Sequence, residues 1–357
     1  RALQGIGGAL LTPGSLAIIE AVFQPDDRAR AIGAWTGLVS IAAALGPLLG
    51  GWLVDVASWR AVFLINIPIG AVVVALALRH VPESRDAEGA GPLDTAGAAL
   101  ATVALAGVTV ALIQAPAGTS PAIVGAAALV GIAAAIAFVQ VERRHPRPML
   151  PLELFRSSRF SGANALTFVV WGPISAIFLF LVVYLQVSLS YSPLESGAAL
   201  LPITVVMLTL SARVGALAQR IGARPFLTLG PLLFGAGVLA IGRIEPGDGY
   251  WDGVLPPLLL FAFGLVSLVA PVTAVALQGA GTRYAGVASG INNAIARTAQ
   301  LLAIAVLPPL AGLSGDAYSD PLAVADAFHT AMFICAGVAA VGSVIGFVTI
   351  RGPGPPA

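Results

Sequence analysis

The chain has 357 residues, of which 58% are hydrophobic and only 10% are charged, and its formal net charge is +1. A soluble domain carries about 25% charged residues, so this composition excludes a soluble globular protein and predicts a polytopic membrane protein. The near-neutral charge also argues against a nucleic-acid partner, and we expect none. The single cysteine, Cys335, cannot form an intrachain disulfide.

Apolar runs long enough to cross a bilayer follow one another along the whole chain. They predict an all-α membrane protein with about eleven transmembrane helices, at 2–22, 31–54, 61–79, 95–114, 121–140, 160–186, 197–218, 225–243, 254–278, 284–312 and 327–350. The loops on one side of these spans hold thirteen arginines and the loops on the other side hold two. Since basic loops stay in the cytoplasm, we expect a multi-pass protein of the cell (cytoplasmic, inner) membrane with a cytoplasmic C-terminus.

The first run opens with R-A-L-Q-G-I-G-G, which places Arg1 and Gln4 at its very start. A charge within a span costs about 2.5–3.5 kcal/mol, so Arg1 is expected either to line a watery cavity or to reach an interface. Glu20 lies at the inner end of this run. An odd number of spans with the C-terminus inside, and no signal peptide, predicts further spans upstream.

The second run contains G-P-L-L-G-G and leads into S-W-R-A-V-F-L-I-N-I-P. Gly46 and Gly50 share a helix face, so a second helix can come close there, and Gly51 follows directly. Pro47 removes a backbone donor and favours a kink. Together they predict a pivot for gating, although small residues at this spacing are also typical of ordinary packing. Asn66 needs a hydrogen-bond partner on a neighbouring helix, in a packing role or a substrate cavity.

The middle of the chain offers weaker candidates. Runs 95–114 and 121–140 form a pair that is rich in Ala, Val and Gly and lies between two charged links. Trp171 is a candidate surface for stacking a hydrophobic substrate, although core or lipid-facing packing is the alternative. Gln186 is a candidate cavity residue beside tyrosines that are typical of a membrane interface.

Two further patterns lie in the last third of the chain. The loop sequence G-A-L-A-Q-R-I-G-A-R runs from Gly215 through Arg220 and Gly222 to Arg224; it is a candidate gating motif or a simple positive-inside anchor. Gln278 is a helix cap or a cavity residue.

Asn293, Arg297 and Gln300 recur at i, i+4 and i+7, beside Asn292, and predict a polar stripe on an otherwise apolar helix. A stripe of this kind facing lipid would be costly, so it is expected to face the bundle interior. A cavity or gating role and a structural or anchoring role both remain open.

These motifs together resemble the major facilitator superfamily. G-P-x-x-G-G followed by S-W-R-x-x-F-x-I-N-x-P is similar to the antiporter signature of its fourteen-span drug:proton antiporter branch (EmrB/QacA-type). R-x-x-Q-G-x-G resembles a span-four motif whose arginine is implicated in proton coupling, which implies this role for Arg1. In a proton-coupled carrier we expect the main proton-carrying acid in the spans upstream, with Glu20 as a further candidate. The 215–224 loop is similar to the superfamily's G-x-L-x-D-R-x-G-x-R motif, with Gln219 in place of the acid.

The resemblance implies an N-terminally truncated chain that holds spans four to fourteen. Residues 1–80 would be the remainder of an N-terminal bundle, 81–157 a linker region with an extra helix pair, and 158–357 a C-terminal six-helix bundle. The expected function is the export of hydrophobic drug-like compounds by proton antiport with alternating access, and export of a lipid or an endogenous natural product is the alternative.

The sequence lacks the motifs of an enzyme, a convergent nucleophile–base pair and a metal-binding spacing. We therefore expect no catalytic activity, no cofactor and no metal. The expected partners are a small hydrophobic substrate, protons and membrane lipids, and the protein is expected to be monomeric.

Overall fold

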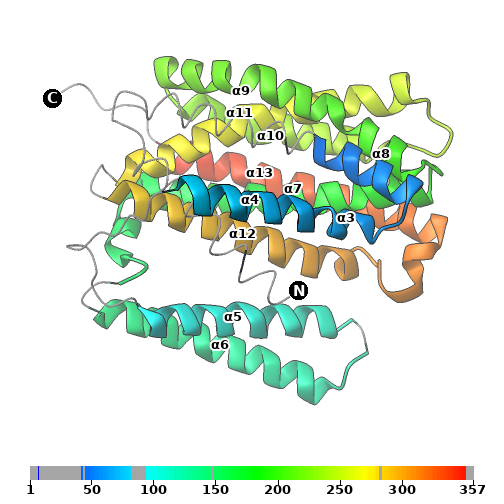
Figure 1. Cartoon of the computed structure of the whole chain (residues 1–357). Coiled ribbons are helices and arrows are strands. Elements are labelled where there is room, and N and C mark those ends of the chain that lie inside the picture. Colours follow the sequence, from blue (N-terminus) through cyan, green and yellow to red (C-terminus); the bar gives the residue numbers. More distant parts are fainter. Residues whose placement is uncertain are drawn as a thin grey trace. The chain divides into compact units, whose positions relative to one another are not determined.

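The computed structural model describes residues 45–81, 94–116, 118–145, 148–280 and 284–350, together with Gly7 and Ala42. Every regular element in these ranges is a helix (Figure 1). The predicted all-α membrane fold is confirmed. Arg1, Gln4 and Glu20 lie outside the described residues, as does all of the run at 2–22 except Gly7.

The chain divides into two compact units, Arg1–Pro92 with Ser192–Leu201, and Leu93–Tyr191 with Pro202–Ala357. The first unit holds a helix at Leu45–Val56, α3 (Ala61–Leu64), α4 (Asn66–His80) and α8 (Pro193–Ala199). The division into three parts expected from the sequence stays a prediction.

The second unit holds the remaining helices. They are α5 (Thr95–Gln114), α6 (Pro121–Arg144), α7 (Ser158–Val187), α9 (Leu201–Ile221), α10 (Arg224–Ile241), α11 (Leu255–Ala280), α12 (Ala285–Leu310) and α13 (Pro321–Thr349), with short 3-10 helices at Leu152–Arg156 and Gly315–Ser319 and a π-helical turn at Tyr250–Val254. Side-chain caps fix several of the starts: Asp94 accepts from the Gly97 N–H before α5, Ser157 from Phe160 before α7, and Asp320 from Leu322 before α13.

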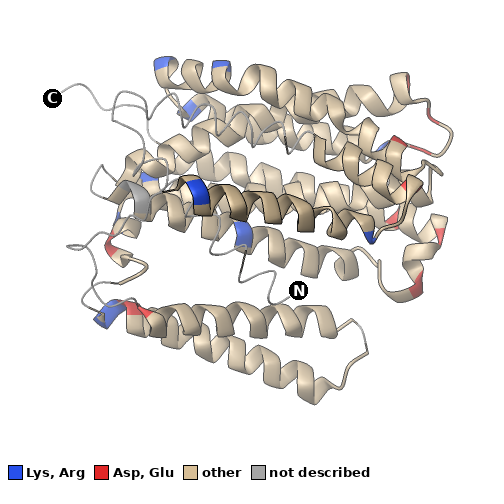
Figure 2. Cartoon of the chain, in the orientation of Figure 1, with Lys and Arg blue, Asp and Glu red and all other residues tan. Residues whose placement is uncertain are grey.

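Nine helices of the described part are long and apolar enough to cross a membrane. They coincide with the nine predicted runs from 61–79 onward. The run predicted at 31–54 is described only from Leu45, as a shorter apolar helix that ends at Val56. In Figure 2 the charged residues lie mainly toward the helix ends and in the loops, which leaves long uncharged stretches between them.

The core of the second unit is built around α7, which packs against α11, α12 and α13. Large side chains of α7, among them Phe160, Ile177 and Tyr184, are fully buried. The Tyr184 ring stacks on Phe328 of α13 with centroids 4.1 Å apart, and its hydroxyl donates to the Ile244 carbonyl at 2.6 Å. Pro173 lies inside α7 without ending it.

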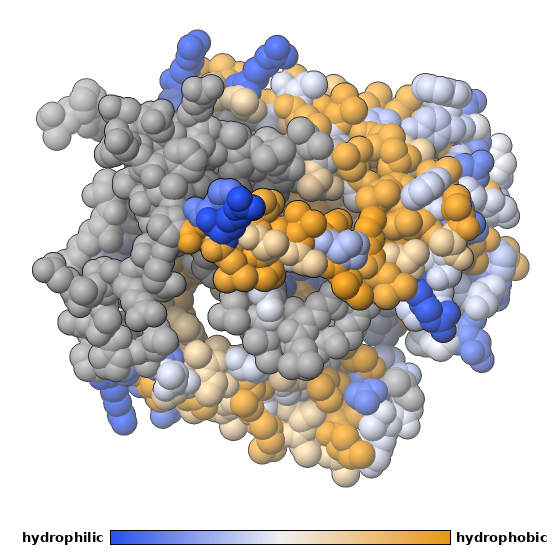
Figure 3. Space-filling model, viewed as in Figure 1, coloured by the Kyte–Doolittle hydropathy of each residue, from blue (hydrophilic) through white to orange (hydrophobic). Residues whose placement is uncertain are grey.

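Other helices turn large apolar side chains outward. None of the residues of α4 is buried, and Ile67, Val72 and Leu78 are each more than half exposed. Figure 3 shows this apolar surface over α4 and over the α5–α6 hairpin. An exposed apolar surface of this extent needs a non-aqueous cover, which lipid supplies.

Candidate functional site

A buried polar cluster joins α7 to α12. The Asn292 side-chain amide donates to Asn164 Oδ1 at 3.1 Å and to Thr167 Oγ1 at 2.8 Å. Asn164 and Thr167 donate in turn to the Phe160 and Ala163 carbonyls of their own helix. Asn164, Thr167 and Asn292 are 2%, 0% and 7% exposed. The three side chains bond to one another and to their own helices inside the bundle, so the cluster holds α7 and α12 together.

The predicted stripe lies next to this cluster on α12. Asn293 and Arg297 are exposed and Gln300 is half-buried, and the Arg297 Nη1 donates to Gln300 Oε1 at 3.3 Å. Arg297 lies in the middle of a helix that is long enough to span a membrane. Among the described residues of its own unit, no element covers Asn293 and Arg297, so the polar side of α12 is available to water or to further parts of the molecule.

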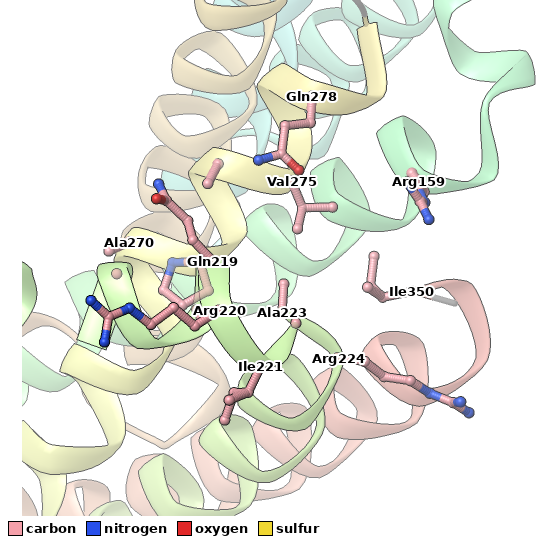
Figure 4. A pocket seen from close by; sticks show the side chains of 15 residues that line it. Arg159, Gln219, Arg220, Ile221, Ala223, Arg224, Ala270, Val275, Gln278 and Ile350 are labelled. Atoms are coloured by element: carbon pink, nitrogen blue, oxygen red, sulfur yellow. The ribbon is translucent and has the colours of Figure 1, made fainter. Parts of the chain in front are cut away.

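A cavity of about 440 Å³ lies within the second unit and is walled by the 215–224 loop motif (Figure 4). Gly215, Arg220, Gly222 and Arg224 line it from the end of α9 and the start of α10, and Gln278 lines it from α11. The structure therefore brings together two candidates that the sequence treated separately. The remaining lining is mostly apolar or small, with Ala218, Gln219, Ile221, Ala223, Ala270, Pro271, Ala274, Val275 and Ile350 in addition to Arg159.

The arginines around this cavity point to different sides in Figure 4. The Arg224 guanidinium lies over the Phe347 ring, 4.8 Å from its centroid, and donates to the Phe347 carbonyl at 3.3 Å. It thereby ties the start of α10 to the end of α13. Gly222 makes the turn between α9 and α10 with a φ of +93°, which a residue with a side chain rarely adopts. Arg224 and Gly222 thus have structural roles in this loop, and Arg220 lies in the last turn of α9, where a positive charge is favourable.

The helix at Leu45–Val56 carries the G-P-L-L-G-G motif and is called the signature helix below. It meets α8 inside the first unit. A Cβ on Gly51 would overlap the Pro193 carbonyl, and a Cβ on Gly197 would overlap the Pro47 carbonyl. No described atom lies within 4 Å of the position that a Cβ on Gly46 or Gly50 would occupy. Close helix approach is therefore observed at Gly51, on a different side of the helix from the pair singled out by spacing. The Asp55 Oδ2 also accepts from the Leu194 N–H at 3.0 Å, at the start of α8.

Three single candidates have simpler surroundings. Asn66 donates to the Val62 and Phe63 carbonyls at 3.1 and 3.3 Å, so the partner expected on a neighbouring helix is instead the preceding turn. Trp171 and Gln186 are half-buried on α7. The structure places neither of them in the cavity of Figure 4.

The family model of the Major Facilitator Superfamily matches residues 1–303. The chain belongs to the Major Facilitator Superfamily. Membership of this family of transporters, together with the apolar helices, makes it an integral membrane protein.

Several relatives of this superfamily member bear names of resistance proteins. The multidrug resistance protein Stp of Mycobacterium tuberculosis is 35% identical over 312 residues, which cover 86% of this chain and 57% of Stp. The tetracenomycin C resistance and export protein of Streptomyces glaucescens is 32% identical over 328 residues, 91% of this chain and 61% of that protein. The methylenomycin A resistance protein of Bacillus subtilis is 33% identical over 325 residues, 89% of this chain and 68% of that protein. The chain spans about three fifths of the length of the first two relatives.

Two features of this facilitator were missed by sequence reasoning. Arg159 counted only as an inner-side charge, yet it lines the cavity. Asn164 and Thr167 drew no attention, because single small polar residues in an apolar run carry no periodic signal; only their pairing with Asn292, more than 120 residues away, reveals them. Among the described residues no group of three or more His, Cys, Asp or Glu side chains could hold a metal ion.

Proposed function

We propose that this protein is a secondary transporter of the fourteen-span drug:proton antiporter branch, which exports hydrophobic drug-like compounds across the cytoplasmic membrane in exchange for protons. Its helices correspond to spans four to fourteen of that arrangement. Residues 1–80 belong to the N-terminal bundle, 81–157 to the linker with the extra helix pair, and 158–357 to the C-terminal bundle. The C-terminus is cytoplasmic, and the protein works as a monomer.

One observation carries the proposal: Arg297 is exposed in the middle of α12, a helix of membrane length. A charge at this depth costs about 2.5–3.5 kcal/mol if it faces lipid. Its bond to Gln300 neutralises no charge, and no described element of its unit covers it, so we infer that water supplies the remaining solvation. A water-filled path beside α12, with Asn293 and Arg297 on its wall, is what a carrier with a central cavity requires.

The close contact of the signature helix with α8 supports alternating access. Gly51 and Gly197 let the backbones of these two segments meet, and Asp55 and Leu194, which are bonded to each other, lie 139 residues apart in the sequence. In the proposed division the two segments belong to different bundles. A contact of small residues lets two rigid bundles rock against each other without displacing large side chains.

The roles in proton coupling follow the family resemblance. Arg1 and Gln4 are proposed to couple proton movement, with Glu20 as a candidate carrier beside an acid elsewhere in the transporter. Gly46, Pro47 and Gly50 are proposed for gating together with Gly51. Asn66, Trp171, Gln186 and Gln278 stay candidates for contact with the substrate.

Export of a natural product is the second candidate. The names of two relatives favour it, the tetracenomycin C resistance and export protein and the probable actinorhodin transporter of Streptomyces coelicolor. The same fold and cavity would serve either substrate. Competition between a hydrophobic dye, tetracenomycin C and a phospholipid in one transport assay separates the possibilities.

The proposal is tested in proteoliposomes that contain the purified protein. A pH gradient is imposed, and movement of a hydrophobic fluorescent dye is followed with and without a protonophore. We expect gradient-driven movement that the protonophore abolishes. Arg297→Gln is expected to lower the initial rate at least about tenfold, which corresponds to about 1.4 kcal/mol, while Arg243→Gln, an exposed loop arginine, leaves it unchanged.

Arg1→Ala and Pro47→Leu are expected to abolish transport while the protein still inserts and purifies normally. Dye movement that ignores the pH gradient in the unmodified protein would overturn the antiport mechanism. A full rate for Arg297→Gln would overturn the assignment of a watery path beside α12.

A further inference from the structure

Two carboxyl groups meet at one end of the α5–α6 hairpin and belong to none of the sites described above. Asp94 precedes α5, and Glu142 lies in the last turn of α6. Both side chains border the same small space over Gly97 and act electrostatically on each other. Glu142 is 2% exposed, which is rare for an acid.

Each carboxyl group has one oxygen with a clear donor. The Gly97 N–H donates to Asp94 Oδ1 at 2.7 Å, and the Leu150 N–H donates to Glu142 Oε2 at 2.8 Å. The other two oxygens, Asp94 Oδ2 and Glu142 Oε1, are buried and accept no hydrogen bond of good geometry from the described residues, although the Met149 N–H lies near the Asp94 carboxyl. A Cβ on Gly97 would lie 2.6 Å from both of them, so only a glycine leaves room for the pair.

Two adjacent acids in such a place cannot both be ionised. Like charges at hydrogen-bonding distance repel strongly, and a buried carboxylate oxygen without a donor costs further free energy. One proton between the facing oxygens removes both problems, because the protonated acid donates to the ionised one. The Gly97 N–H holds the pKa of the Asp94 carboxyl below its ordinary value. Asp94 is therefore the ionised member of the pair and Glu142 the protonated one.

We propose that Asp94 and Glu142 form a proton-binding site, in which one proton between Glu142 Oε1 and Asp94 Oδ2 clasps the end of the α5–α6 hairpin at neutral pH and is released in alkaline solution. This clasp goes beyond the proposed transport function and does not depend on it. Its ligand is a proton alone, and no metal is required.

The clasp reaches the segment that leads into the next helix. Through Leu150, Glu142 fixes the chain just before Leu152–Arg156, where the buried Leu154 packs with Phe160 of α7 and with α12. Loss of the proton would leave two negative charges side by side and weaken the hold of Glu142 on this segment. The site therefore links the protonation of the hairpin to the order of the segment between α6 and α7.

Among the described residues, three further ionisable side chains lie close to the pair in the sequence. His145 acts electrostatically on both carboxyls, and Arg143 and Arg144 lie in the same last turn of α6. Of the helices packed on α5, α12 carries one ionisable residue, Arg297, whose guanidinium bonds to Gln300. A positive charge on His145 favours the doubly ionised pair and therefore opposes the shared proton.

Infrared spectroscopy of the purified protein tests the site directly. A protonated carboxyl group has a carbonyl stretching band that ionised carboxylates lack. We expect the difference between the unmodified protein and Glu142→Gln at neutral pH to contain this band, and the band to disappear from the unmodified protein in alkaline solution. Glu153→Gln, a change of an exposed acid in the segment that follows α6, should leave the band unchanged.

Hydrogen exchange gives the second readout. The carboxamide that Glu142→Gln introduces can accept from Leu150 and donate to Asp94 at any pH, so the exchange protection of this variant at 148–156, corrected for intrinsic rates, is expected to stay constant. Protection in the unmodified protein should fall severalfold on alkaline titration. Absence of a protonated-acid band in the unmodified protein at neutral pH, or a band that persists in both Glu142→Gln and Asp94→Asn, would overturn the proposal, even if either variant folded poorly.

Discussion

The buried cluster between α7 and α12 makes the sharpest stability prediction. Asn292→Leu keeps a similar side-chain volume and removes two hydrogen bonds, to Asn164 Oδ1 and Thr167 Oγ1. Hydrogen bonds between membrane helices are worth about 0.6 kcal/mol on average and at most about 1.7. The two bonds therefore contribute about 1–3 kcal/mol, and the free energy of unfolding should fall by that amount.

The matched control is the next residue in the chain. Asn293 is exposed, so Asn293→Leu should change the free energy of unfolding by less than about 0.5 kcal/mol. Reversible unfolding of both variants in mixed micelles measures the difference. A double-mutant cycle of Asn292→Leu with Thr167→Val isolates the shorter bond and should give a coupling energy of about 0.6–1.7 kcal/mol. Equal stability of the two asparagine variants would refute the assignment of Asn292 as the buried partner.

Two more predictions concern packing in the same unit. Tyr184→Phe keeps the stack on Phe328 but leaves the buried Ile244 carbonyl without its donor, so it should lower the free energy of unfolding by about 1–3 kcal/mol. The control Tyr318→Phe changes a more exposed tyrosine and should alter the free energy of unfolding little. Thermal unfolding in detergent distinguishes the two variants, and equal effects would contradict the role of the Tyr184 hydroxyl. Gly107→Val places its Cβ 2.7 Å from the Gly131 Cα and should destabilise the α5–α6 hairpin by about 1–3 kcal/mol. The control Gly125→Val has no described atom within 4 Å of its Cβ and should be tolerated. Hydrogen exchange of α5 and α6 measures the loss of stability, and a tolerated Gly107→Val would mean that the two helices can separate freely.

Run length and hydropathy were enough to predict most of the membrane helices, because lipid requires a long apolar segment whatever its neighbours are. The ends were less accurate wherever polar residues continue a helix. The run predicted at 121–140 extends to Arg144, since a helix does not stop where its apolar residues do. The run predicted at 197–218 begins at Pro193, where Ser192 and Glu195 form a capping box that a hydropathy window does not register.

The contacts of individual site residues were harder to predict. Sequence spacing tells which residues share a face of one helix, but it does not tell which face contacts another helix. Gly46 and Gly50 share a face, yet the close contact with α8 falls on Gly51, which points about 100° away from Gly50. The choice of face depends on where Pro193 and Gly197 lie, and they are far along the chain.

The same argument explains the two neighbouring asparagines of α12. Asn293 aligns with Arg297 and Gln300, so periodicity assigns it to the polar stripe, where the structure finds it exposed. Asn292 aligns instead with the buried Ala296 and Ala299, where an unsatisfied amide would be costly. Its tolerance there depends wholly on Asn164 and Thr167, which are 128 and 125 residues away. A polar residue on the apolar side of a membrane helix therefore predicts that a partner exists, and only the packing of the helices identifies which residue it is.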